Sequence, residues 1–566
     1  MVIQPQILVL IGSIILFFWF FKEVKSFLFW SYLWQLKNYH IGRFFAHFDT
    51  YNGKKIIRNW GLFFKCFVFL GILLIMGSAT YLYPNNINEF LNSISLFIIA
   101  CIPLVFLLYI AEGFLSIVGL LKKSIKRPEM TSKMLFLLMV IFIPLLLITV
   151  LLGLNFYQSY LYPSQWMIFD LISFAIVILA FDILTPLIVS FIILLFQPIT
   201  VFMRNRIIKK AIKKREALTN LLVIGITGSY GKSSTKEFLK EILSSEFKVA
   251  STERNENSEI GISQYILNHV NDEHEIFICE MGAYNRGGIK LLCKIAKPKI
   301  GILTGINNQH LATFGSQKNI VRGKFELIDS LPSEGLAVLN WDSELIKDNF
   351  NSTVNSVKYS IFEKQDIWAE EIKEDKEGIS FRVVLKTGES HLFKLNIHGV
   401  HNVSNLLSAI AVAKKLGMEL EAIAERVKNI QGGISIKRVD NFDVIDTTYS
   451  SNFDGIISHL EYLKNWEGRK ILVMPCLIEL GREGKETHRK IGRKIGEVCD
   501  LAIITSRDYF KELEKGAVEA GMKPEDVLFV QDGGKILKKI FATANEGSVV
   551  LLESRVPRLL IDKLVK

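Results

Sequence analysis

The sequence predicts an α-helical membrane domain followed by two α/β domains. Half of the 566 residues are hydrophobic, the long apolar runs lie within about the first 200 residues, and strand-like and helix-like segments alternate after residue 220. The length also exceeds that of one typical domain. We therefore divide the chain into a membrane domain (1–200), a basic linker (201–220) and two α/β domains (221–430 and 431–566).

Apolar runs of sufficient length predict about five membrane-spanning helices. A span needs roughly 20 predominantly apolar residues. The runs lie at 6–21, 60–83, 91–119, 134–156 and 166–197. The first run lacks the basic start and the small-residue cleavage site of a secretory signal peptide, so we interpret it as an anchor.

The connecting segments predict how the chain is oriented. Segments 22–59 and 120–133 and the run after residue 200 are rich in Lys and Arg, whereas 83–90 and 157–166 have none. Because basic loops stay on the cytoplasmic side, we expect a multi-pass plasma-membrane protein with its N-terminus outside and its α/β domains in the cytoplasm. Basic segments beside apolar runs suit anionic membrane lipid, so the net charge of +11 does not indicate a nucleic-acid partner.

Three carboxylates fall inside the predicted spans. Charges in hydrocarbon are costly and are often functional. For Glu112 and Asp170 we favour a position near a span end that reaches the interface, while for Asp182 a functional and a structural role are equally open. The segment Phe27–His47, rich in Trp and Phe with interspersed Lys and Arg, is typical of a helix lying on the cytoplasmic interface.

A phosphate-binding loop is predicted after the linker. The apolar run 221–226 leads through Thr227-Gly-Ser-Tyr-Gly-Lys-Ser-Ser-Thr235 into a helical pattern. In such a strand–loop–helix unit the backbone N–H groups face phosphates, so we expect Lys232 to reach the β- and γ-phosphates of ATP and Ser233 to bind Mg²⁺. The predicted nucleotide-binding residues of this loop are Thr227, Gly228, Ser229, Tyr230, Gly231, Lys232, Ser233 and Ser234.

The loop and the motifs after it resemble the Mur ligases. The strict Walker spacing would place glycine at 226, where this chain has Ile, and the variant spacing is similar to the Mur ligase loop. Further motifs match in order over about 220–566: Thr252-Glu-Arg-Asn-Glu-Asn-Ser-Glu-Ile-Gly261, Phe277-Ile-Cys-Glu-Met-Gly-Ala283, Gly301-Ile-Leu-Thr-Gly-Ile-Asn-Asn-Gln-His-Leu311, Gly323-Lys-Phe-Glu326, Val338-Leu-Asn-Trp-Asp342, His398-Gly-Val-His-Asn-Val-Ser-Asn405, Val444-Ile-Asp-Thr-Thr-Tyr-Ser-Ser-Asn452, and Ile478-Glu-Leu-Gly481 with His488. The stretch after the loop looks like that of the MurF type, which adds D-alanyl-D-alanine to a UDP-N-acetylmuramoyl tripeptide.

This resemblance implies an ATP-dependent ligase that forms an amide bond through an acyl phosphate. Its substrates would be a UDP- or lipid-linked muramoyl peptide of the cell wall and an amino acid or dipeptide, with ATP and Mg²⁺ as cofactors. The implied fold is a P-loop parallel-sheet Mur ligase central domain, interrupted at 353–396 by short strand-like runs, and a Rossmann-like C-terminal domain. The strands expected in the latter are 442–446, 470–474, 501–505, 527–530 and 549–553.

The resemblance also implies roles for single residues. Glu280 and His310, each at a strand end, would hold the metal with Ser233, and Lys324 occupies the position that is carbamylated in the family. Together with Lys232 these form the predicted catalytic set, while Asn340 would approach the adenine and Asp446 the ribose. Structural alternatives stay open: Glu280 as a surface carboxylate, His310 as a structural histidine, Lys324 as a solvated helix lysine and Asn340 as a turn residue.

Several positions depart from the family pattern. Gly432-Gly433 stands where a Gly-Arg pair is expected, with Arg438 as a candidate substitute, and Leu552-Glu-Ser-Arg555 replaces Lys-Gly-Ser-Arg. About 200 membrane residues replace the domain that grips the uridine nucleotide, so our hypothesis is a lipid-linked acceptor or an acceptor made by a membrane partner. The alternatives are an ATP-binding membrane scaffold or regulator with a degenerate ligase domain, and an amide-polymer synthase of the poly-γ-glutamate type.

Overall fold

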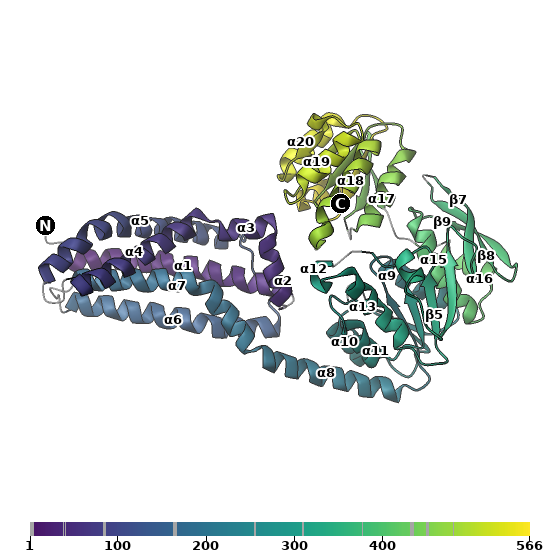
Figure 1. Ribbon diagram of the computed structural model, residues 1–566, viewed down its shortest axis with the longest axis horizontal. Helices are drawn as coiled ribbons and strands as arrows, with labels where there is room; N and C mark the ends of the chain where they lie inside the picture. The colour runs from purple at the N-terminus through teal and green to yellow at the C-terminus, as the bar shows by residue number, and fades with distance from the viewer. Residues whose placement is uncertain are drawn as a thin grey trace. The chain divides into compact units, whose positions relative to one another are not determined.

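The computed structural model describes residues 5–565 apart from 38, 40, 83–86, 162–166, 254–255, 308–310, 376, 429, 431–434, 449–451 and 479. It divides into two compact units, Met1–Phe202 and Met203–Lys566 (Figure 1).

The first unit is a bundle of long helices. Its long helices are α1 (Pro5–Leu36), α4 (Trp60–Leu82), α5 (Ile87–Leu121), α6 (Ser132–Leu161) and α7 (Met167–Leu195), with the short helices α2 (Ile41–Ala46) and α3 (Tyr51–Ile57) between α1 and α4. Helix α1 packs against α5, α6 and α7. Aromatic side chains such as Trp19, Phe27 and Tyr109 fill the core, while large apolar side chains such as Leu74 and Leu107 face outward.

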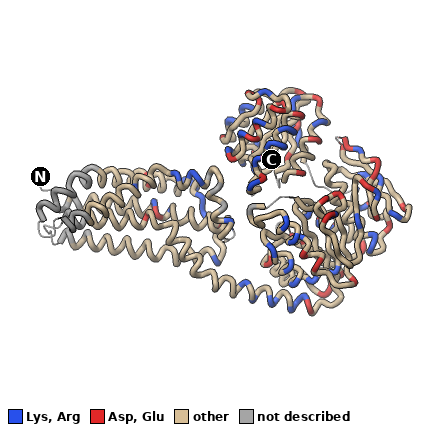
Figure 2. Tube along the Cα trace, in the orientation of Figure 1, with Lys and Arg blue, Asp and Glu red and all other residues tan. Residues whose placement is uncertain are grey.

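Four helical segments among the described residues are long and apolar enough to cross a membrane by length and composition. They are Gly53–Gly77, Cys101–Leu121, Ser132–Asn155 and Ile172–Ala217, and they overlap the second to fifth predicted runs. The first predicted run, 6–21, lies within α1, which is not among these four. Figure 2 shows few charged residues along the helices of the bundle.

One prediction for this unit was wrong. Phe27–His47 is not a separate interfacial helix, because α1 continues to Leu36 and Phe27 is fully buried in the bundle core. The basic linker 201–220 is mostly helical, because α8 (Gln197–Ala217) runs through it. The apolar and basic residues of α8 alternate at helical spacing. Ile208, Ala211 and Arg215 are buried, whereas basic residues such as Lys209 and Lys210 are exposed.

The second unit begins with a large mixed sheet. Its nine described strands have the order β2 (Val249–Ser251), β3 (Ile276–Glu280), β1 (Leu222–Thr227), β4 (Ile300–Leu303), β5 (Leu336–Asn340), β6 (Asn355–Ser360), β7 (Ile367–Glu374), β8 (Ile379–Leu385) and β9 (Ser390–Leu395). Strands β2 to β6 are parallel, whereas β7, β8 and β9 pair antiparallel. The segment 353–396 therefore extends the sheet, where the sequence had suggested an interruption.

Helices cover both faces of this sheet (Figure 1). On one face lie α9 (Lys232–Leu243), α15 (His401–Lys415) and α16 (Leu420–Val427), and on the other α10 (Glu259–His269), α11 (Gly288–Ala296) and α13 (Gln317–Asp329). Each face of the sheet has its own hydrophobic core. In β1, Ile224 and Ile226 lie in the core on the side of α9, and Val223 lies in the core on the side of α10, as the two-residue period of a strand requires. A strand buried on both sides is apolar throughout, which is why 221–226 could be recognised from the sequence.

The C-terminal sheet has the Rossmann-like character that was predicted. Its six described strands have the order β10 (Ser435–Val439), β11 (Phe442–Thr447), β15 (Val549–Glu553), β12 (Lys470–Met474), β13 (Leu501–Ile504) and β14 (Val527–Phe529). The last five are parallel and confirm the expected strands within one or two residues. Strand β10, which pairs antiparallel with β11, was not predicted.

Candidate active site

The loop between β1 and α9 has the backbone shape of a phosphate cradle. Gly228 and Gly231 have φ angles of 156° and 76°, and α9 begins directly after Gly231. A Cβ at Gly228 would lie 2.1 Å from Thr304 Oγ1, and one at Gly231 2.2 Å from Asn405 Oδ1. Only glycine fits both the conformation and the space. The loop can therefore turn tightly, so that its backbone N–H groups point toward the position that a phosphate would occupy at the N-terminus of α9.

Neighbouring strands hold the loop in place. Ser229 N donates to Gly305 O at 2.7 Å, and Thr227 Oγ1 donates to Met281 O at 2.9 Å. Thr304, buried at the end of β4, lies within hydrogen-bond reach of the Tyr230 carbonyl. These contacts come from the carboxyl ends of β1, β3 and β4, where open α/β sheets place their ligands.

A hydroxyl and a carboxylate meet at the start of α9. Ser233 Oγ donates to Glu280 Oε2 at 2.7 Å, and Asn257 Nδ2 donates to Glu280 Oε1 at 2.9 Å. Glu280 is 4% exposed, so the reading of it as a surface carboxylate is wrong. The pair offers the oxygen donors that Mg²⁺ prefers, alongside phosphate oxygens, and the residues present therefore fit the predicted ion.

Two lysines, the half-buried Lys232 and the buried Lys324, lie near this carboxylate. Burial lowers the pKa of Lys232, and the charge of nearby Glu280 opposes that shift. Lys232 Nζ donates to Gly228 O at 2.9 Å. Burial, reinforced by the charge of Lys232, lowers the pKa of Lys324 to about 7. Lys324 is 2% exposed, which excludes the solvated-lysine alternative. Because its pKa is about 7, a substantial fraction of the amine is neutral near neutral pH.

Other predicted site residues are held at strand ends. Asn340, at the end of β5, is buried and donates through Nδ2 to Thr304 O at 2.7 Å, while its Oδ1 accepts from Asp342 N at 2.9 Å. Asp446, in β11, accepts from Thr448 N at 2.9 Å. Arg438 lies on β10 and pairs with Asp443 at 3.1 Å.

Some predictions fall outside the described residues. His310 and Gly432-Gly433 are among them. Within the described part of the chain, no group of three or more His, Cys, Asp and Glu residues is arranged to hold a metal ion. The predicted ligands that the structure places together are therefore Ser233 and Glu280.

Several residues that build the site were not predicted from the sequence. Asn257, Thr304 and Asn405 were all inside quoted motifs, yet none was given a role. Their contribution depends on tertiary contacts between segments that are far apart, such as Asn257 with Glu280 across 23 positions. The available signal was a polar residue placed at or just beyond the end of a buried strand or at a helix start.

Together, the buried strand, the two-glycine loop, Lys232 and the Ser233–Glu280 pair define a P-loop nucleotide-binding protein of the α/β class. Residues 226–413 match the family described as Mur ligase middle domain, and residues 434–555 match Mur ligase, glutamate ligase domain. Through these two regions the chain belongs to the Mur ligase family.

Relatives and solved structures agree with this membership. The chain is 28% identical over 356 residues to a UDP-N-acetylmuramoyl-tripeptide–D-alanyl-D-alanine ligase of Synechocystis sp., covering 59% of this chain and 71% of that protein. It is 32% identical over 284 residues to the protein of the same name from Buchnera aphidicola, covering 49% and 61%. A crystal structure of MurF from Acinetobacter baumannii superposes with a TM-score of 0.58 at 26% identity, covering 64% of this chain and 79% of that one.

A second solved structure supports the fold alone. MurF from Thermotoga maritima in complex with ADP has a TM-score of 0.56 at 24% identity and covers 64% of this chain and 82% of its own.

Proposed function

We propose that this protein is a membrane-anchored, ATP-dependent ligase that forms an amide bond on a cell-wall peptide precursor. The observation that carries the proposal is the convergence of Lys232, Ser233, Glu280 and Lys324 at one P-loop, within a chain that matches both Mur ligase regions. The relatives named above add D-alanyl-D-alanine to a UDP-N-acetylmuramoyl tripeptide, and we assign this chain the same class of reaction.

In the proposed reaction the substrate carboxylate attacks the γ-phosphorus of ATP, so that an acyl phosphate forms and ADP leaves. The amine then attacks the acyl carbon, phosphate leaves, and the amine loses a proton. Catalysis of phosphoryl transfer is mainly positioning and charge stabilisation. The Gly228–Gly231 backbone would orient the phosphates, and the ammonium of Lys232 would offset charge on the β- and γ-phosphates.

Ser233 and Glu280 would hold Mg²⁺, with His310 as a further predicted ligand. Mg²⁺ bound there would draw charge from the phosphate oxygens during transfer. For Lys324 we propose carbamylation: the neutral amine adds to carbon dioxide, loses a proton and becomes an anion beside the metal site. Asn340 would contact adenine and Asp446 ribose.

The helical unit supports a lipid-linked acceptor. Four segments have the length and composition of spans, and the basic connections are typical of the cytoplasmic side. We propose a multi-pass plasma-membrane protein with its N-terminus outside and its ligase domains in the cytoplasm. Such an anchor would keep the site near precursors carried by membrane lipid.

The test is acceptor-dependent phosphate release by the full-length protein in lipid nanodiscs. UDP-muramoyl tripeptide with D-alanyl-D-alanine is offered first, and a lipid-linked muramoyl peptide second. Lys232→Ala removes the phosphate contact, and Lys240→Ala, which changes an exposed lysine of the same helix, is the matched control. We expect turnover in wild type and Lys240→Ala and a loss of at least about 100-fold in Lys232→Ala.

Acceptor preference separates the substrate hypotheses. Faster turnover with the lipid-linked peptide supports the anchored-acceptor proposal, whereas turnover only with the UDP-linked peptide contradicts it. Absence of turnover with either acceptor, while ATP still binds, would contradict the ligase and favour a nucleotide-binding scaffold.

A further inference from the structure

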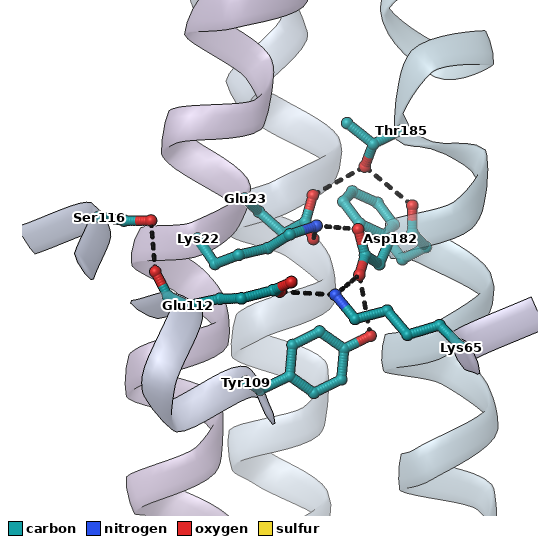
Figure 3. A network of polar contacts seen from close by, with 9 residues as sticks. Lys22, Glu23, Lys65, Tyr109, Glu112, Ser116, Asp182 and Thr185 are labelled. Carbon is teal, nitrogen blue, oxygen red and sulfur yellow. Dashed lines mark hydrogen bonds and ion pairs between the residues drawn. The ribbon is translucent and has the colours of Figure 1, made fainter. Parts of the chain in front are cut away.

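Charged side chains meet in the interior of the helical bundle (Figure 3). Lys22 and Glu23 come from α1, Lys65 from α4, Glu112 from α5 and Asp182 from α7. Glu23 is fully buried, and Lys65 and Asp182 are 3% and 8% exposed. Ionised groups buried this deeply persist only when their charges and hydrogen bonds are balanced. Glu112, for which a position near a span end was expected, accepts from Lys65 Nζ at 2.6 Å, and its side chain is 29% exposed.

Asp182 is the best-satisfied carboxylate of this ion-pair cluster. It accepts from Lys22, from Lys65 Nζ at 2.8 Å and from Tyr109 Oη at 3.1 Å. Two ammonium groups and a phenol therefore surround it, and it is the group best placed to stay ionised.

The charges of the cluster do not cancel. Two ammonium groups, Lys22 and Lys65, face the three carboxyl groups of Glu23, Glu112 and Asp182. Helix α6, which also packs on α1, has no Asp, Glu, Lys, Arg or His after Lys133. With all five groups ionised the cluster would carry one uncompensated negative charge. The Glu112 side chain is 29% exposed, whereas Glu23 is fully buried, so Glu23 is the carboxyl group whose negative charge is most costly to keep.

Hydrogen-bond counting points independently to Glu23. Thr185 Oγ1 lies 2.8 Å from Glu23 Oε2 and 2.8 Å from the Phe181 carbonyl. A hydroxyl has one hydrogen, and a carbonyl oxygen only accepts. If Thr185 donates to Phe181, the contact with Glu23 is satisfied when the carboxyl group carries a proton and donates it to Thr185. An ionised Glu23 would compete with Phe181 for the same hydrogen.

We propose that the helical bundle binds one proton on Glu23, between Lys22 and Thr185. The second carboxyl oxygen, Oε1, accepts from Lys22 Nζ at 2.8 Å, and this neighbouring ammonium disfavours a metal cation. Sodium or another cation also needs several oxygen ligands, whereas the contacts described for Glu23 are one ammonium and one hydroxyl. The groups facing the proton are thus Lys22 on α1, Lys65 on α4, Tyr109 and Glu112 on α5, and Asp182 and Thr185 on α7.

Infrared difference spectroscopy of the full-length protein in lipid nanodiscs tests this site, because a protonated carboxyl group has a carbonyl stretch that a carboxylate lacks. We expect this band at neutral pH in wild type, its loss in Glu23→Gln and its retention in the control Glu129→Gln, which changes an exposed carboxyl group outside the cluster. Thr185→Val should move the band to higher frequency, because the acceptor of the carboxyl proton is removed. A band that persists in Glu23→Gln, or no band in wild type, would overturn the proposal.

Asp182→Asn tests the charge balance itself. Without the Asp182 charge, two lysines face two carboxyl groups, so Glu23 should ionise and its band should disappear although Glu23 is still present. Persistence of the Glu23 band in a folded Asp182→Asn protein would contradict the balance argument. Loss of the wild-type band on adding NaCl but not KCl would identify sodium as the occupant and overturn the proton. None of these outcomes depends on ligase activity.

Discussion

Lys324 shows at the residue scale how burial prepares a side chain for chemistry. A lysine on a helix normally extends into water and keeps its charge. Here burial and the charge of Lys232 lower its pKa to about 7, so the amine is partly neutral where solvated lysines are charged. A neutral amine is nucleophilic, and the proposed carbamylation would convert it into an anion.

Replacing Lys324 with Met should lower activity and change how stability depends on pH. Without the amine we expect phosphate release to fall at least about 100-fold. The folded wild type has a Lys324 pKa of about 7 against about 10.4 when unfolded. Between these values the unfolded state binds more protons, so the wild type gains stability as pH rises. Lys324→Met lacks this dependence, because it has no charged amine to bury. The melting temperature of Lys324→Met should therefore exceed that of wild type most at or below pH 7, and the difference should shrink towards pH 10.

Melting temperatures from pH 6 to 9 measure this effect, with Lys240→Met as the exposed control. A constant difference between Lys324→Met and wild type across that range would contradict a depressed pKa. Omission of carbon dioxide from the buffer, followed by addition of bicarbonate, separately tests whether activity depends on carbamylation.

Single residues were predictable when their role is local and less so when it depends on distant partners. Ser233 and Glu280 were selected from motifs, and the structure places them in contact at 2.7 Å. Asn257 and Thr304 complete the same site but have no local signature. The partner of Glu112 was not predicted, because the sequence does not reveal that Lys65, 47 positions away, lies beside it.

The β1–α9 loop shows at the element scale why two glycines are needed at the phosphate site. Gly231→Ala should reduce ATP binding strongly, because it adds a Cβ that would lie 2.2 Å from Asn405 Oδ1 at a φ of 76°. Gly547→Ala is a matched control, since Gly547 has a φ of 78° with nothing within 4 Å of an added Cβ. Both substitutions carry the same backbone penalty of roughly 1 kcal/mol.

Calorimetric titration with ATP and melting temperature measure the two effects separately. We expect both variants to lose similar stability from the backbone, with a loss of ATP affinity of at least about tenfold only in Gly231→Ala. Equal ATP affinity in the two variants would show that the crowding at Asn405 is unimportant.

Arg215 shows how α8 is fixed to the second unit. Its guanidinium donates to three carbonyl groups: Ala296 O at 3.0 Å, Leu218 O at 2.8 Å and Leu221 O at 2.9 Å. These contacts join the end of α8 to the end of α11 and to the start of β1. Hydrogen bonds from a charged donor contribute about 1.5–3 kcal/mol each, although their effects are not additive when one residue makes all three.

Arg215→Met should therefore destabilise the second unit by about 3 kcal/mol, because it leaves three carbonyl groups without their donor. Lys210→Met, on the exposed side of the same helix, should change stability by less than about 0.5 kcal/mol. Chemical unfolding followed by the fluorescence of Trp341 and Trp368 compares the two. Equal stability of the variants would mean that α8 is a passive connection.

Elements were predictable from the sequence where burial leaves a clear period. The strands of both parallel sheets are short apolar runs, and those of the C-terminal sheet were placed within one or two residues. Strands β6 to β9 were identified as strand-like but not as part of the main sheet, because alternation within a segment does not reveal its partners. The composition of 201–220 suggested a linker, since its positive charges obscured the buried spacing of Ile208, Ala211 and Arg215.

At the scale of the whole molecule, the chain joins a helical bundle with few charged residues to an α/β unit with many (Figure 2), and large apolar side chains of the bundle are exposed. The family resemblance covers the second unit alone, because the matched regions begin at residue 226. Composition therefore has to supply the prediction for the first unit. It predicts which segments cross the membrane, and the number of crossings decides on which side the N-terminus lies.

Reporter fusions test the proposed orientation. With five spans we expect an externally active reporter, such as alkaline phosphatase, to work when fused within 83–90 or 157–166. A reporter that works only in the cytoplasm should be active when fused within 120–133 or after residue 217. Neutralising Lys122, Lys123, Lys126 and Arg127 together should weaken this preference, because basic loops are retained inside.

If α1 does not cross the membrane, four spans remain, the N-terminus lies inside, and the ligase still lies inside. A fusion at the N-terminus therefore decides between four and five spans. External exposure supports five spans. Cytoplasmic exposure would mean that α1, which carries Lys22 and Glu23, packs in the bundle without crossing the membrane.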